Sequence, residues 1–150
     1  MKDLPPAARA VAVAARAAVT AAVERDRDGF EAATATLATV DGSAHVLGLV
    51  VRRLLEERHP DGLDGDDVRR TLEDAVRASA AWQPDVDPHV MLTLLGGALG
   101  VYDPDQDDDA PGPAALARHG PLLVAHLLAG PVDGYLTDAF AEIRRTELHD

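Results

Sequence analysis

Cysteine is absent from this 150-residue sequence, asparagine is absent too, and aromatic residues make up only 3% of it. Without cysteine the chain has no disulfides, no thiolate nucleophile and no thiolate metal ligand, and we expect a cytoplasmic location, where reducing conditions call for none. With so few aromatics the core must be built from Leu, Val and Ala, which suits closely packed helices. The abundance of Ala and Arg is typical of a GC-rich bacterial genome and carries no functional information.

Motifs for nucleophilic catalysis are also missing. The only serines are Ser43 and Ser79, and neither lies in the Gly-x-Ser-x-Gly turn that exposes a catalytic serine. Ser79 falls on the buried stripe of an expected helix, where a hydroxyl ordinarily bonds back to a carbonyl. The sequence predicts no cofactor and favours a protein that is not an enzyme.

Basic charge is scarce as well. The formal net charge is −12, and residues 61–109 alone carry thirteen acidic and three basic side chains. Binding to nucleic acid requires a basic patch, and an anionic membrane surface repels acidic chains, so we expect neither partner. The longest apolar run, 90–101, is too short to span a bilayer, and Arg9 and Arg16 interrupt the apolar core that a signal peptide would need.

What the sequence does contain is a strongly apolar stretch at residues 88–102, whose only polar side chain between Val90 and Val101 is Thr93. Asp87 and Pro88 are typical of a helix start, and a helix that is apolar on every side belongs inside a protein. Gly96 and Gly100 would let a neighbouring backbone approach. A strand over 90–95 and a nucleotide-binding glycine loop are less consistent with the context, because no helix follows the glycines directly.

The remaining apolar spacing predicts a compact all-α bundle of six to seven helices around 88–102, with 122–128 as the second core element. Ser43, Asp64 and Asp133 are the expected caps of three of these helices, and Pro121 would remove one backbone donor. We expect a single domain, 1–150, with a mobile acidic loop at 103–113. The expected helices, besides 88–102, are 5–26, a short one carrying residues 30–40, 44–58, 64–82, 114–129 and 134–147.

Three patterns could ligate metal, and each is incomplete. The alternating carboxylates Asp103, Asp105, Asp107 and Asp109 resemble a calcium loop, which then fails at Asp108 and Ala114 where Gly and Glu belong. His119 and His126 are seven residues apart and have no local carboxylate, so a structural role is favoured. Glu56 and His59 form one Glu-x-x-His, whereas di-iron bundles use two.

The function best supported by the sequence is a non-enzymatic protein–protein interaction or regulatory module that self-associates as a homodimer. The apolar segments 44–51 and 122–128 indicate such a surface, and the acidic middle third could meet a basic partner. The alternative is a small-molecule-binding domain or an enzyme, with an apolar pocket between helices that is lined by Met91 and edged by His89, Tyr102 or His126. A weaker alternative is a divalent cation at 103–109.

Overall fold

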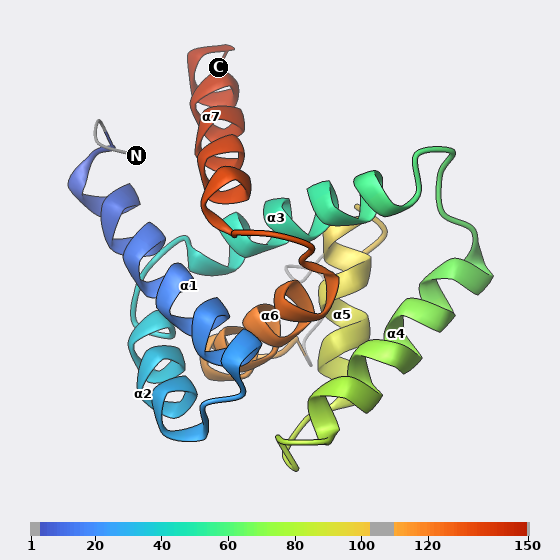
Figure 1. Ribbon diagram of the computed structural model, residues 1–150. Helices are drawn as coiled ribbons and strands as arrows, with labels where there is room; N and C mark the ends of the chain where they lie inside the picture. The colour runs from blue at the N-terminus through green and yellow to red at the C-terminus, as the bar shows by residue number, and fades with distance from the viewer. Residues whose placement is uncertain (1–3, 103–109, 150) are drawn as a thin grey trace.

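The computed structural model describes residues 4–102 and 110–149, and in these ranges the chain forms seven α-helices and no strand (Figure 1). The expected all-α class and the number of helices are confirmed. One hydrophobic core draws side chains from all seven helices. The helices are α1 (Pro6–Glu24), α2 (Arg27–Leu37), α3 (Ser43–Arg58), α4 (Gly65–Ala80), α5 (Pro88–Ala98), α6 (Pro113–Leu127) and α7 (Asp133–His149).

Aspartates begin three of the helices, because their side chains accept from backbone N–H groups that have no partner within the helix. Asp26 caps α2, Asp87 caps α5, and Asp64 forms a reciprocal capping box with Asp67 at the start of α4. The hydrogen bond from the Asp67 amide lowers the pKa of Asp64. The expected cap at Ser43 is wrong: Gly42 is the N-cap of α3, and the Ser43 hydroxyl donates to the Val40 carbonyl instead.

Helix α6 occupies the centre of the bundle, in contact with α1, α2, α3, α4 and α5 (Figure 1). It can be approached closely because one face carries small side chains. A Cβ added to Gly120 would lie 3.2 Å from Leu47 Cδ1, so the glycine allows α3 to pack directly on the α6 backbone. Leu123 and Val124, on the next turn, are fully buried. The segment 122–128, which we expected to be the second element of the core, is therefore its central element.

Helix α5 is shorter and more peripheral than the sequence indicates. It ends at Ala98 instead of residue 102, because the Val101 and Gly100 amides bond back to the Gly96 and Gly97 carbonyls and close the helix with Gly100 at φ +77°. Gly96 makes room for this turn, with Tyr102 Cβ 3.1 Å from where its own Cβ would be, and not for a neighbouring helix. Leu92 is 46% exposed, so α5 packs against α3, α4 and α6 on one side only.

Helix α1 packs against both α2 and α6 through alanine and valine side chains that allow close contact. By length and composition alone it is apolar enough to cross a membrane, and in the described residues it is the one helix of which this is true. Eight of its residues are buried in the core, but only 44% of its apolar stretch is buried inside the molecule. The outer face of α1 thus exposes apolar side chains to solvent.

The two segments from which self-association was inferred are covered within the chain. In 44–51, Val46, Leu47, Val50 and Val51 are buried, and most of 122–128 is buried at the centre. Of their apolar side chains, only those of Ala44, Leu49, Ala125 and Leu128 remain partly or fully exposed, which is a small apolar area for a second molecule. Self-association therefore needs a different surface.

If α6 is the centre of the bundle, truncating it should be costly. Leu123→Ala should lower the free energy of unfolding by about 3 kcal/mol, because it leaves a cavity among fully buried neighbours. The control Leu92→Ala, on the exposed side of α5, should cost less than about 1 kcal/mol. Urea unfolding followed by circular dichroism measures both; equal losses would contradict the central position of α6.

Candidate functional site

A cavity of about 920 Å³ is lined mainly by residues of α3 and α5. In Figure 1, α5 (yellow) runs up toward α3, and the two helices are in contact. We call it the α3–α5 groove. Its lining is mainly aliphatic and glycine, from Ala44, His45, Gly48, Leu49, Arg52 and Glu56 of α3, Thr93, Leu94, Gly97 and Ala98 of α5, Leu99, Gly100, Tyr102 and Pro111 of the connections, and Leu116 of α6.

Gly48 and Gly97 leave space in this groove because they have no side chain. No described atom lies within 4 Å of the position that a Cβ would take at Gly48 or at Gly97. A glycine inside a helix costs about 1 kcal/mol relative to alanine, and the usual compensation is a close contact of the kind seen at Gly120. Gly48 and Gly97 lack such a contact among the described residues, and both face the same open space.

The polar side chains of the groove lie along its α3 side. Arg52 Nε is 3.1 Å from Glu56 Oε1, one turn further on, and both side chains are more than half exposed. His45 is also exposed, and the Thr93 hydroxyl donates to the His89 carbonyl within α5. An exposed pair of this type contributes little to stability, so Arg52 can exchange its partner at small cost.

The residues predicted to form an apolar pocket do not come together. Tyr102 lines the α3–α5 groove, whereas Met91 is fully buried in the core. His89 is exposed at the start of α5, and His126 is half-buried on α6, where its carbonyl accepts from Arg58. His45 and Arg52 were not singled out from the sequence, because nothing in their local spacing marks them.

Metal ligation has little support within residues 4–102 and 110–149, where no group of three His, Asp or Glu side chains is placed to hold an ion. His59, the C-cap of α3, has its Nδ1 3.9 Å from the Asp67 carboxylate of α4, so the histidine of the Glu-x-x-His pattern contacts α4. The predicted calcium ligands Asp103, Asp105, Asp107 and Asp109 lie outside the described residues.

His119 is the most buried titratable side chain of the described chain, at 3% exposure. Its Nδ1 lies 2.8 Å from the Ala115 carbonyl, and its Nε2 accepts from the Asp87 amide at 2.9 Å. These two bonds require a neutral ring with the proton on Nδ1. Burial lowers the pKa of His119, and it also lowers that of His126. His119 thus fixes the start of α5 against α6 as a structural side chain.

Arg118 performs a similar connecting role nearby. Its guanidinium forms two hydrogen bonds to the Glu31 carboxylate, at 3.1 and 2.5 Å, and approaches Gln83 at 3.5 Å. Gln83 is buried, next to Trp82, which packs edge-on against Phe30 with ring centroids 5.2 Å apart. Together these contacts join α2, α6 and the α4–α5 connection. They set the position of α5 and so the width of the α3–α5 groove.

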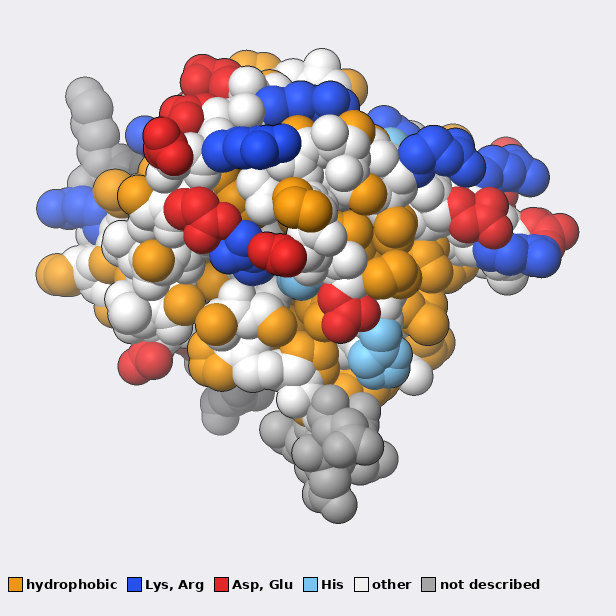
Figure 2. Space-filling view, turned by 90° about the horizontal axis from the view of Figure 1, so that it is seen from below, with side chains coloured by type: hydrophobic (Ala, Val, Ile, Leu, Met, Phe, Trp, Pro, Cys, Tyr) orange, Lys and Arg blue, Asp and Glu red, His pale blue; other side chains and the backbone are white. Residues whose placement is uncertain are grey.

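The charged side chains on the face seen in Figure 2 form no comparable site. On the face seen in Figure 2, acidic and basic side chains are interspersed with hydrophobic ones, without a large area of one sign. Several of the arginines are neutralised locally, as Arg77 is by Asp74 at 3.3 Å. The apolar groove is therefore the strongest candidate site.

Comparisons with protein-family models, with curated proteins and with solved structures gave no match.

The buried ring of His119 predicts a pH dependence of stability. In the unfolded chain histidine titrates near 6.5, whereas burial lowers the pKa in the folded protein, so the unfolded state binds protons first as the pH falls. The stabilisation is fully present above about pH 6.5 and is lost below it. We expect the Tm to fall between about pH 7.5 and pH 5, and to fall less in His119→Gln. The exposed His45→Gln variant is the control, and an unchanged pH dependence in His119→Gln would contradict the assignment.

Proposed function

We propose that this protein is a binding protein that takes one small, largely apolar molecule in the α3–α5 groove. The observation that supports this most directly is the pair of helical glycines, Gly48 and Gly97, which face the groove with no described neighbour. A volume of about 920 Å³ falls within the range of ligand pockets in proteins. A bound molecule would supply the contacts that these glycines lack.

The lining also suggests how a ligand would be oriented. Leu49, Leu94 and Leu99 offer aliphatic contact, and the charged side chains of the lining, Arg52 and Glu56, lie on the α3 side. A molecule with an apolar body and a single acidic group would place that group beside Arg52, in competition with Glu56. His45, Arg52 and Glu56 of the groove are exposed, and Arg52 is paired with Glu56, so the lining supports binding better than catalysis.

A cytoplasmic location accompanies this proposal. A chain without cysteine needs no oxidising compartment, and an apolar metabolite is a ligand that a cytoplasmic carrier or sensor would meet. A basic protein partner for the acidic middle third also remains a proposal.

The groove can be filled without disturbing the fold. Gly48→Leu and Gly97→Leu introduce side chains into open space within helices, so both variants should stay folded. We expect wild type to bind 1-anilinonaphthalene-8-sulfonate, an apolar ring system with one sulfonate, at a single saturable site. Each leucine variant should weaken binding by about tenfold or more, because its side chain occupies the ligand volume. Fluorescence titration with a stoichiometry measurement checks this.

Two matched controls distinguish the effect of filling the groove from the effect of replacing a glycine. Gly97→Ala should raise the free energy of unfolding by about 1 kcal/mol and keep most of the binding. Gly134→Leu changes a glycine in α7 that also has open space but lies outside the groove, and it should bind as wild type does. Undiminished binding in both groove-filling leucine variants would rule out this site.

A further inference from the structure

The outer face of α1 is an apolar helix surface that nothing in the described chain covers. Residues 6, 10, 13, 17 and 20 follow one another at alternating spacings of four and three, which is the spacing of a coiled-coil seam. Val13 is 60% exposed, and Ala10, Ala17 and Thr20 are exposed on the same stripe. On this stripe no charged side chain lies between Pro6 and Glu24.

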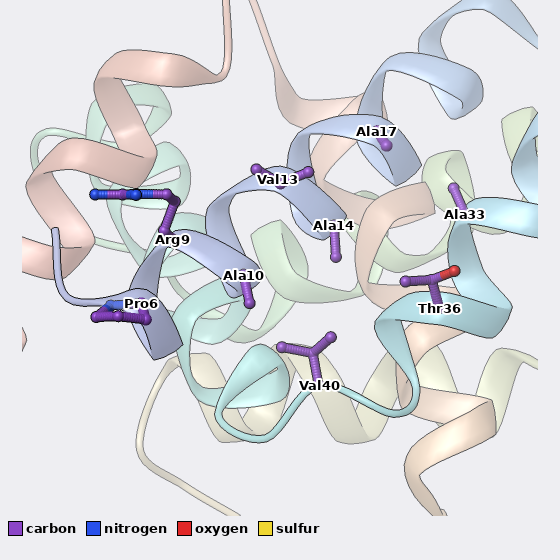
Figure 3. A pocket seen from close by; sticks show the side chains of 9 residues that line it. All are labelled: Pro6, Arg9, Ala10, Val13, Ala14, Ala17, Ala33, Thr36 and Val40. Carbon is purple, nitrogen blue, oxygen red and sulfur yellow. The ribbon is translucent and has the colours of Figure 1, made fainter. Parts of the chain in front are cut away.

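A groove of about 540 Å³ continues this stripe toward α2. Figure 3 shows Ala10, Ala14 and Ala17 of α1 and, across the groove, Ala33 and Thr36 of α2. Side chains this small leave room for the ridge of another helix between α1 and α2. The α1–α2 hairpin therefore has the form of half a four-helix bundle, in which two further helices would complete the packing.

The charged side chains at the two ends of α1 indicate that the two further helices come from a second copy of this chain. Arg9 lies near the N-terminal end and Glu24 at the C-terminal end, and neither is in an ion pair among the described residues. If a second α1 lies antiparallel, with the two-fold axis between residues 16 and 17, Arg9 of each copy meets Glu24 of the other. A parallel arrangement would place like charges together at both ends.

We propose that two copies of this chain associate through antiparallel α1 helices, with α2 of each copy flanking the partner's α1 in a four-helix bundle. In this register Arg16 and Ala17 lie beside the two-fold axis, with Arg16 held by Asp133 of its own chain at 2.6 Å. Val13 faces Thr20 of the other copy, and Ala10 faces Val23. The interface is isologous, so each complementary pair occurs twice. It is separate from the α3–α5 groove and does not depend on ligand binding there.

The first test is the oligomeric state. Sedimentation velocity over a range of concentrations should show a dimer for wild type and a monomer for Val13→Asp, because an unpaired carboxylate would be buried in the seam. Val101→Asp, which changes an 81% exposed side chain after α5, is the matched control and should remain dimeric. A wild-type monomer at every concentration, or a dimer that Val13→Asp leaves intact, overturns the proposal. A monomer that co-sediments with phosphatidylcholine vesicles through Val13 would assign the face to a lipid surface, and that result also overturns it.

The second test addresses the arrangement of the helices. Arg9→Glu or Glu24→Arg alone should weaken dimerisation on the order of tenfold, since each creates two like-charge contacts, and the double exchange should restore it. Because the chain has no cysteine, Ala17→Cys should form a disulfide-linked dimer under mild oxidation, whereas Ala10→Cys should not. Cross-linking of Ala10→Cys in preference to Ala17→Cys indicates parallel helices and overturns the antiparallel proposal. The cysteine cross-linking distinguishes the two arrangements even if Val13→Asp does not fold.

Discussion

The close approach of α1 and α3 to α6 is the contact on which the rest of the bundle depends. At Gly120 the space for a side chain is taken by Leu47 of α3, and on the other side α1 contributes alanines that are fully buried, among them Ala15 and Ala18. Because these side chains are small, the helix backbones lie close together. This close packing fills the core although large aromatic side chains are few. It also explains how Pro121 is tolerated inside α6: the helix is held by neighbours on several sides.

Polar contacts then fix the peripheral helices on this centre. His119 holds the start of α5 through the Asp87 amide, and Arg118 ties α6 to Glu31 of α2. On the opposite side the Tyr135 hydroxyl donates to Glu57 at 2.6 Å and joins α7 to α3. Helix α5 is therefore positioned by α6 and α4 as well as by α3, and the α3–α5 groove lies where it meets α3.

The sequence was informative where the structure is decided locally. Side-chain caps at Asp64 and Asp87 and the ends of the expected helices 44–58 and 114–129 were predicted within a few residues, because they depend on neighbours in the chain. The turn that ends α5 at Ala98 was missed, since Gly100 can equally serve inside a close-packed helix. The lining of the groove could not be predicted, because His45, Gly48 and Gly97 acquire their role only when α3 and α5 are placed side by side.

The identity of the central helix was the larger difference, and its cause is physical. A helix that is apolar on every side has a large surface to bury, but the pattern does not show which neighbour covers that surface. Helix α6 carries Arg118, His119 and Pro121 and still lies at the centre, because its polar groups find partners there. Helix α5 is more uniformly apolar, yet its Leu94 lines the α3–α5 groove, and Val13 of α1 faces solvent. In both helices the apolar surface that the chain itself leaves uncovered coincides with a proposed binding surface, for a small molecule in one case and for a second copy in the other. On these two proposals, the apolar pattern of this sequence is accounted for by the chain together with a ligand and a second copy.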